Sequence, residues 1–247
     1  MPCKYYYSLV ELDDLEEAAE SAHPSQQEQA LQIVADIFNP IGLPYGVMGG
    51  FNFYLRGSGR TTDDVDLAVS SAQSLETTLE LLNHDDRITR PREKMIWVGG
   101  VARIFVLVRN ASDQPPPEMG GQNHGQEQGQ QVQIDLKWQR TEGHGMPSDL
   151  SLATELLPIP STGGKVRFLK IGPLVRAKFQ SYGRGKEGDY SDLLFVCKDA
   201  RYSGIVREEA AEHVNPEKRR AFLEEVLERN PDQEKAVRYA LRIPPDE

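Results

Sequence analysis

Two aspartates on one predicted strand constrain this chain more than any other feature. Asp64 and Asp66 flank Val65, and the apolar run Val65–Val69 predicts a β-strand. Successive side chains of a strand point to opposite faces, so Asp64 and Asp66 share one face while the valines and Leu67 share the other. The two carboxylates are therefore expected about 6.7 Å apart along the strand.

A third carboxylate is predicted on a second strand. Residues 132–138 alternate again and leave Asp135 on the polar face, opposite Val132, Ile134, Leu136 and Trp138. If the two strands are neighbours, three carboxylates converge, and each pair repels by about 2–3 kcal/mol at an effective dielectric constant of roughly 20. A raised pKa or a bound cation would compensate the cluster. Mg²⁺, or Mn²⁺ in its place, prefers such an all-oxygen site. The alternative is that each aspartate faces solvent independently.

The residues that precede Asp64 complete a longer pattern. Gly49-Gly50 is followed by thirteen residues, including Arg60 and Thr62, and then by Asp64-Val65-Asp66-Leu67. This stretch resembles the G-[GS] … R-x-T-x-D-[IV]-D-L signature of the DNA polymerase beta-like nucleotidyltransferase superfamily. It is most similar to the branch of minimal and abortive-infection-type nucleotidyltransferases. The resemblance covers residues 45–138, and it implies that Asp64 and Asp66 bind metal and that Asp135 is the third catalytic and metal-binding carboxylate.

One position departs from the family pattern. Many members carry Ser after the first glycine, and its hydroxyl contacts a nucleotide phosphate, whereas Gly50 offers only its backbone N–H. Backbone amides at a glycine turn that leads into a helix still form an anion site, and Ser58, Arg56 or Arg60 could replace the missing hydroxyl. The alternative is that the two glycines only form a tight turn. The residues expected to contact the nucleotide in this region are Gly49, Gly50, Arg56, Ser58, Arg60 and Thr62.

A basic stretch follows in the C-terminal half. Residues 162–186 contain seven basic residues and no acidic ones, in a chain with a net charge of −10. Pro173 suits the first position of a helix, and at 100° per residue Lys178 falls within the apolar arc of that helix. A buried ammonium group needs a partner. The alternative for the whole stretch is an ordinary solvated face.

Two partners are open to Lys178. Asp189 is expected to face inward on the following helix, which would make a purely structural pair. The segment Leu174–Leu194 also resembles the family helix pair L-x-x-x-K … R-x-K-x-x-D-x-x-D-L. This resemblance implies that Lys178 helps to hold the triphosphate, and it adds Arg184 to the nucleotide site. Both roles are compatible, because the aspartate can position the lysine.

The rest of the chain predicts an α+β fold: a mixed β-sheet flanked by helices, followed by a mostly helical C-terminal region. A capping box of Ser25 and Glu28 predicts a helix over 26–38. Residues 111–131 contain three consecutive prolines and many glycines and glutamines, which favours a mobile insertion between two paired strands. Residues 150–163 are interpreted as a linker. We therefore divide the chain into a catalytic domain, 1–150, and a region completing the nucleotide site, 151–247.

Composition excludes several classes of protein. An acidic chain of 247 residues does not suit a general nucleic-acid coat. Two distant cysteines, Cys3 and Cys197, argue against a disulfide scaffold and a structural zinc site. No secretory signal and no apolar run long enough for a membrane span is recognisable. We therefore expect a cytoplasmic protein without a membrane partner.

The sequence thus predicts a metal-dependent nucleotidyltransferase. It would move a nucleoside monophosphate from an NTP, expected to be ATP, to an acceptor hydroxyl and release pyrophosphate. Two Mg²⁺ ions would be held by Asp64 and Asp66, with Asp135 on one of them. The acceptor, which could be RNA, a small molecule or a protein hydroxyl, and the oligomeric state stay open. The alternatives are a catalytically silent nucleotide-binding or partner-binding (antitoxin-like) module and a scaffold that binds no ligand.

Overall fold

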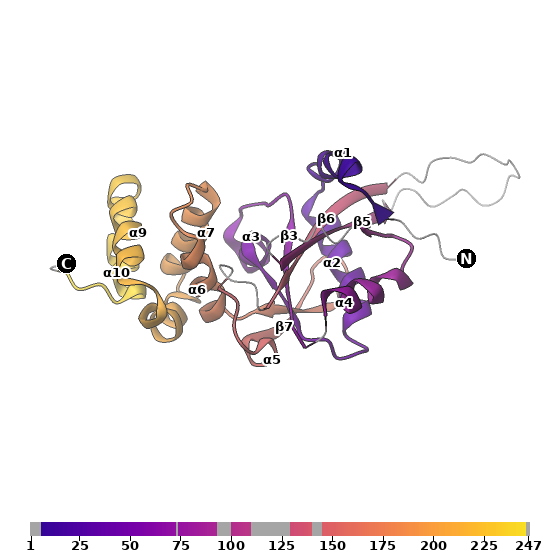
Figure 1. Cartoon of the computed structure of the whole chain (residues 1–247). Helices are drawn as coiled ribbons and strands as arrows, with labels where there is room; N and C mark the ends of the chain where they lie inside the picture. Colours follow the sequence, from indigo (N-terminus) through magenta and orange to yellow (C-terminus); the bar gives the residue numbers. More distant parts are fainter. Residues whose placement is uncertain (1–5, 73, 93–99, 110–128, 140–144, 246–247) are drawn as a thin grey trace, which may run out of the picture.

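The protein is built around one mixed β-sheet. The computed structural model describes residues 6–72, 74–92, 100–109, 129–139 and 145–245. Its eight strands lie in the order β1-β4-β5-β6-β3-β2-β8-β7, with helices packed around them (Figure 1). This architecture confirms the predicted α+β fold. In the part of the chain that is described, no helix combines the length and the apolar character needed to cross a membrane.

The strands place the two aspartate segments side by side. β3 runs parallel to β6 and antiparallel to β2, and the register sets Asp66 opposite Asp135. β5 pairs antiparallel with the other edge of β6. The strand bounds are β1 Tyr6–Tyr7, β2 Tyr45–Met48, β3 Val65–Val69, β4 Ile88–Pro91, β5 Val101–Arg109, β6 Gly129–Trp138, β7 Thr154–Pro158 and β8 Lys165–Leu169.

The helices fall into two groups. Helices α1, α2 and α4 lie around the sheet, while α6, α7, α9 and α10 gather at the C-terminal end of the molecule (Figure 1). The bounds are α1 Leu9–Ala19, α2 Pro24–Phe38, α3 Gly49–Phe53, α4 Leu75–Leu81, α5 Leu150–Ala153, α6 Ile171–Ser181, α7 Glu187–Lys198, α8 Ser203–Ile205, α9 Pro216–Arg229 and α10 Glu234–Leu241. Short 3₁₀ or π turns are η1 Tyr54–Ser58, η2 Leu82–His84, η5 Val206–Ala210, η6 Ala211–His213 and η7 Pro231–Gln233.

Two main hydrophobic cores hold these groups. In the first, Leu31 and Val34 of α2 belong to one cluster with Val65 and Leu67 of β3, so the apolar face of β3 is buried as predicted. In the second, the C-terminal helices pack around Phe222, which contacts the rings of Phe179, Tyr182 and Tyr190. Met48 and Phe53, on either side of the first glycines, belong to this second core. The turn between β2 and α3 therefore lies at the junction of the two cores.

The predicted cap of α2 is wrong. The helix begins at Pro24, and His23 is its N-cap, with a ring nitrogen that accepts a hydrogen bond from Ser25 N at 3.3 Å. Glu28, expected in a capping box, is buried and accepts a hydrogen bond from Ser161 N at 2.7 Å. Proline has a fixed φ that suits the first helical position, so Pro24 starts the helix before Ser25 can cap it.

The predicted linker over 150–163 is also wrong. Residues 150–158 form α5 and β7, and β7 pairs antiparallel with β8, which in turn lies parallel to β2. The C-terminal half of the chain therefore extends the sheet of the N-terminal half. Pro158 ends β7 at the outermost position of the sheet, where a missing N–H is tolerated.

The predicted insertion does separate two paired strands, β5 and β6. Its last three residues, 129–131, belong to β6 and pair with Leu107, Val108 and Arg109. Residues 110–128 lie outside the described part of the chain, so the predicted mobility of this segment stays a prediction.

Candidate active site

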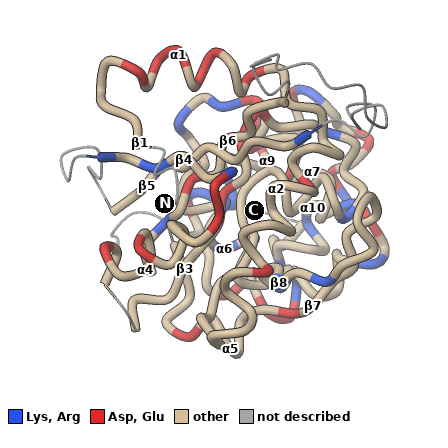
Figure 2. Tube along the Cα trace, turned by 90° about the vertical axis from the view of Figure 1, so that its right-hand side faces the viewer, with Lys and Arg blue, Asp and Glu red and all other residues tan. Residues whose placement is uncertain are grey.

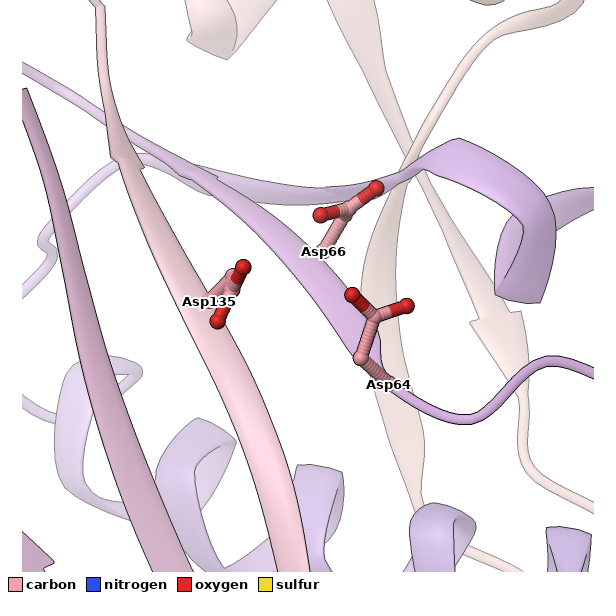
Figure 3. A group of neighbouring side chains, drawn as sticks. All are labelled: Asp64, Asp66 and Asp135. Carbon is pink, nitrogen blue, oxygen red and sulfur yellow. The ribbon is translucent and has the colours of Figure 1, made fainter. Parts of the chain in front are cut away.

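Three carboxylates converge where β3 meets β6 (Figure 3). Asp66 and Asp135 lie opposite each other on the two parallel strands, and Asp64 directly precedes β3. Each contributes one carboxylate oxygen to a group whose atoms all lie within 4.8 Å of one another. The predicted convergence is therefore confirmed. An all-oxygen donor set of this size suits a hard divalent cation such as Mg²⁺.

The carboxylate cluster perturbs its own protonation. Burial and the negative charges of Asp66 and Asp135 raise the pKa of Asp64 to about 6. A shift in this direction is one of the two compensations expected when like charges are brought together. Protons and cations therefore compete for the same oxygens near neutral pH.

Two basic side chains that the sequence analysis did not single out also compensate the cluster. Lys137 Nζ lies 2.5 Å from Asp66 Oδ1. Arg103 donates two hydrogen bonds to Asp135, at 2.8 and 3.1 Å, and also forms an ion pair with Glu16 of α1. Lys137 could have been found from the sequence, because it is two residues after Asp135 and so lies on the same face of β6. Arg103 lies opposite Asp135 in the pairing of β5 with β6.

The two glycines let polar groups approach the backbone closely. Gly49 has φ +65°, and a Cβ atom there would lie 2.0 Å from Asp66 Oδ2. A Cβ atom on Gly50 would lie 2.1 Å from Arg60 Nη2 and 2.4 Å from the Thr62 methyl group. The Arg60 guanidinium therefore occupies the space into which a serine side chain at position 50 would extend. A serine at position 50 would therefore require the Arg60 side chain to move.

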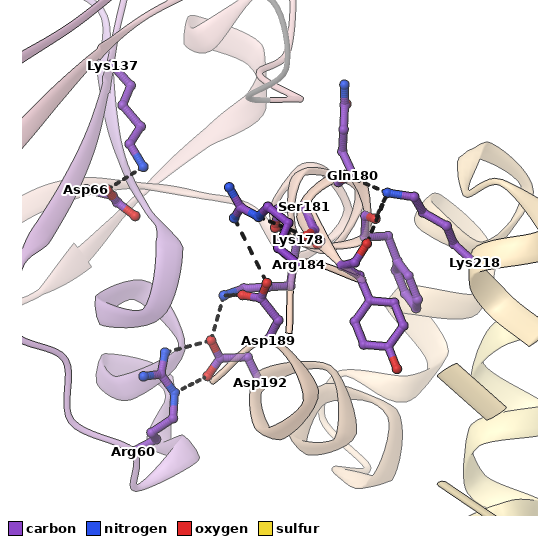
Figure 4. A network of polar contacts seen from close by, with 12 residues as sticks. Arg60, Asp66, Lys137, Lys178, Gln180, Ser181, Arg184, Asp189, Asp192 and Lys218 are labelled. Carbon is purple, nitrogen blue, oxygen red and sulfur yellow. Dashed lines mark hydrogen bonds and ion pairs between the residues drawn. The ribbon is translucent and has the colours of Figure 1, made fainter. Parts of the chain in front are cut away.

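A buried ionic network joins the signature loop, residues 54–64 between α3 and β3, to the C-terminal helices (Figure 4). Arg60 donates two hydrogen bonds to Asp192 of α7, at 3.0 and 2.8 Å. Lys178 of α6 lies 2.9 Å from Asp189 and 2.9 Å from Asp192. The side chain of Asp192 is fully buried, and that of Lys178 is only 9% exposed. The inward lysine and its pairing with Asp189 are confirmed, while the phosphate contact of Lys178 stays a prediction.

One cavity of about 620 Å³ connects the carboxylate cluster with this network. The predicted residues that line it are Gly49, Gly50, Arg60, Thr62, Asp64, Asp66, Asp135, Lys178 and Arg184. Lys186 and Asp189 also face it, and Lys137, Arg103, Glu16 and Glu20 line it as well. Glu16 lies in α1 and Glu20 is its C-cap, and acidic residues are spaced along this helix in Figure 2. The cavity therefore has a side rich in carboxylates and a side with four basic side chains, Arg60, Lys178, Arg184 and Lys186.

Two predicted nucleotide contacts lie elsewhere. Arg56 is buried and donates hydrogen bonds to Asn52 Oδ1, Glu155 Oε1 and the Leu169 carbonyl at 2.7–2.9 Å. Ser58 lines a separate cavity beside α7 and α9. The reason lies in the η1 turn, where Gly57 and the following Gly59 have positive φ and turn the chain before Arg60. Arg56 thus anchors the loop to β7 and β8.

Thr62 acts on the cluster through the backbone. Its hydroxyl donates a hydrogen bond to the Asp64 carbonyl at 2.9 Å, and its own carbonyl accepts one from Gln27 of α2 at 2.6 Å. These bonds fix the segment that leads into β3. Thr62 therefore positions Asp64, and its methyl group packs against Gly50.

Comparison with known proteins identifies the fold. No family model matches the chain, and no curated protein matches it in sequence. A solved structure of an antigenic nucleotidyltransferase-like protein from Paracoccidioides brasiliensis is similar with a TM-score of 0.55 and 16% identity, over 87% of this chain and 93% of that one. JHP933 from Helicobacter pylori gives a TM-score of 0.47 and 16% identity, over 90% and 81% of the two chains.

The protein thus has a nucleotidyltransferase-like fold. The fold is the one expected from the similarity of the residues around Asp64 and Asp66 to the nucleotidyltransferase signature.

Proposed function

We propose that this protein is a metal-dependent nucleotidyltransferase that transfers a nucleoside monophosphate from an NTP to an acceptor hydroxyl. One observation carries the proposal. Three carboxylate oxygens within 4.8 Å of one another share a cavity with Arg60, Lys178, Arg184 and Lys186. A divalent cation and a polyphosphate are the two ligands that such a pair of surfaces suits.

The basic side of the cavity would hold the triphosphate. Arg60 and Lys178 are already positioned by Asp192 and Asp189, so little side-chain entropy is lost when they bind phosphate oxygens. Arg184 is more exposed and would contact the nucleotide from the mouth of the cavity. Gly49 and Gly50 line the same cavity, and we expect their backbone N–H groups, at the turn between β2 and α3, to contact the phosphates.

The carboxylate side would hold the metal and the acceptor. Asp64, Asp66 and Asp135 would supply oxygens for Mg²⁺, or Mn²⁺, which when bound would neutralise phosphate charge and lower the pKa of the acceptor hydroxyl. The acceptor oxygen forms a new bond to the α-phosphorus, and the bond from that phosphorus to the bridging oxygen breaks. Pyrophosphate leaves with the electron pair, and a carboxylate of the cluster takes the hydroxyl proton. We expect ATP as the donor and an acceptor from RNA, a small molecule or a protein.

Nucleotide labelling tests this function. The purified protein is incubated with Mg²⁺, each α-phosphate-labelled NTP in turn, and the RNA, protein and small-molecule fractions of a cell lysate. We expect label in one fraction and an equal amount of pyrophosphate, both lost in Asp66→Asn and retained in the control Asp232→Asn, whose residue is exposed in η7.

Calorimetric measurement of NTP and Mg²⁺ binding, made alongside the labelling, separates the silent alternative. A protein that binds NTP but releases no pyrophosphate with any fraction is a nucleotide-binding module without this activity. A protein that binds neither Mg²⁺ nor NTP would contradict both readings.

A further inference from the structure

Lys137 places a positive charge inside the carboxylate cluster, directly against Asp66. It follows Asp135 by two residues on β6, so both side chains lie on the same face of the sheet. Its partner across β3 is Ala68, whose short side chain leaves room for the lysine stem beside Asp66. The ammonium group then lies 2.5 Å from Asp66 Oδ1, with the side chain 18% exposed (Figure 4).

This contact covers one of the two carboxylate oxygens of Asp66, Oδ1, which is buried. The other carboxylate oxygen, Oδ2, faces Gly49 so closely that a Cβ atom there would lie 2.0 Å away. Metal ions such as Mg²⁺ bind carboxylate oxygens at about 2.0–2.1 Å. An ammonium group at hydrogen-bond distance from Oδ1 therefore stands where a cation would have to approach that oxygen.

The charges around the cluster lead to the same conclusion. Asp64, Asp66 and Asp135 contribute three carboxylates, and Lys137 and Arg103 place two cationic groups against them. A divalent ion that binds without a nucleotide meets carboxylates whose negative charge Lys137 and Arg103 already largely neutralise. A triphosphate brings several negative charges of its own, and Mg²⁺ characteristically binds through one or two carboxylates together with substrate phosphates.

We propose that Lys137 is a built-in counter-cation of the carboxylate cluster, which a metal must displace, so that metal binds well only together with the nucleotide. The inference rests on the proposed function, since it concerns the same cavity. It assigns Lys137 a positioning role: the lysine keeps the three carboxylates together before substrate arrives and makes metal loading depend on the triphosphate.

Metal binding without any turnover tests the role of Lys137. Mn²⁺ affinity is measured by calorimetry and by electron paramagnetic resonance, first with the metal alone and then with an ATP analogue that has a methylene group between the α- and β-phosphates. The variants are Lys137→Met, which keeps the stem and removes the charge, and Lys137→Arg, which keeps the charge. Lys165→Met, at an exposed position of β8, is the matched control.

With metal alone, we expect Lys137→Met to bind Mn²⁺ about ten- to a hundredfold more tightly than the wild type. Lys137→Arg and Lys165→Met should stay within about twofold of the wild type. The analogue should raise the Mn²⁺ affinity of the wild type strongly and that of Lys137→Met much less. Without metal, Lys137→Met should melt at a lower temperature, and Mn²⁺ should restore it.

Three results would overturn the inference. The first is equal Mn²⁺ affinity of the wild type and Lys137→Met, which would make the lysine an ordinary structural partner. The second is an equal effect of the analogue on both proteins. The third, which needs no variant to fold, is Mn²⁺ binding by the wild type that is as tight without the analogue as with it. Failure of the analogue to bind at all would instead count against the proposed function, because the metal-only comparison judges Lys137 by itself.

Discussion

At the scale of single residues, the carboxylates of the cluster are not equivalent. Asp66 lies against Lys137 and Asp135 against Arg103, whereas burial and the neighbouring carboxylates raise the pKa of Asp64 to about 6. A carboxyl group with a higher pKa in the folded state binds its proton more tightly there. It therefore stabilises the fold below its unfolded pKa near 4, and this contribution is lost as pH rises through about 6.

Asp64→Asn should consequently stabilise the metal-free protein at high pH. We expect the free energy of unfolding in the presence of a chelator to rise by on the order of 1–3 kcal/mol at pH 8, with the gain shrinking towards pH 4. Urea unfolding at pH 4.5, 6 and 8 measures it, with Asp232→Asn as the control. A loss of stability at pH 8 would show that ionised Asp64 is needed for the fold itself.

Lys178 combines structure and function in one side chain. Lys178→Met removes a charge that two buried carboxylates share, although Asp192 keeps Arg60 as a partner. We expect the free energy of unfolding to fall by about 3–5 kcal/mol and NTP affinity to weaken by roughly ten- to a hundredfold. The double variant Lys178→Met/Asp189→Leu should recover most of the stability and none of the NTP affinity. NTP affinity that stays unchanged throughout would remove Lys178 from the nucleotide site.

At the scale of elements, the sequence predicts best where one face of a strand is buried. The bounds of β3 and the shared face of Asp64 and Asp66 follow from alternation, because a slip by one residue would turn every apolar side chain outward. The meeting with Asp135 depended in addition on the pairing of β3 with β6, which alternation alone does not reveal. β7 was missed because it lies at the sheet edge, where Leu156 is 51% exposed and the pattern is weak.

The nucleotide contacts show the limit of spacing arguments. Arg56 was assigned to the site from its place in the signature loop, but the η1 turn directs it into the interior towards Glu155. Arg56 lies one helical turn after the buried Asn52, to which it donates a hydrogen bond, so it faces the interior, and the left-handed Gly57 turns the chain only after it. Lys137 and Arg103, in contrast, could have been found, because both follow from the pairing of β6 with its neighbours.

The turn between β2 and α3 gives a prediction at this scale. Gly49→Ala forces a methyl group to within about 2 Å of Asp66 Oδ2 at a backbone with φ +65°. The left-handed conformation costs roughly 1–2 kcal/mol, and the clash must displace Asp66 as well. We therefore expect a larger loss of stability than for Gly42→Ala, which has φ +66° but open space around it. Chemical unfolding of both variants checks this, and equal losses would show that Gly49 serves only the turn.

At the scale of the whole molecule, the candidate site lies where two cores meet. The sheet supplies the carboxylates, and α6 and α7 supply Lys178 and its aspartate partners. The ion pair between Arg60 and Asp192 joins the two parts across the cavity. The net charge of −10 describes the whole chain and conceals this local division into an acidic side and a basic side.

The central claim is that the carboxylates are a catalytic unit and not a structural one. The measurement that tests it most directly is pyrophosphate release from NTP and Mg²⁺, with the acceptor fraction found by labelling, for Asp64→Asn and Asp66→Asn alongside their thermal melts. Both variants should lose turnover by at least about a thousandfold while their metal-free melting temperatures stay equal to or above that of the wild type. Turnover that survives either substitution, or a fold that collapses with both, would contradict the account.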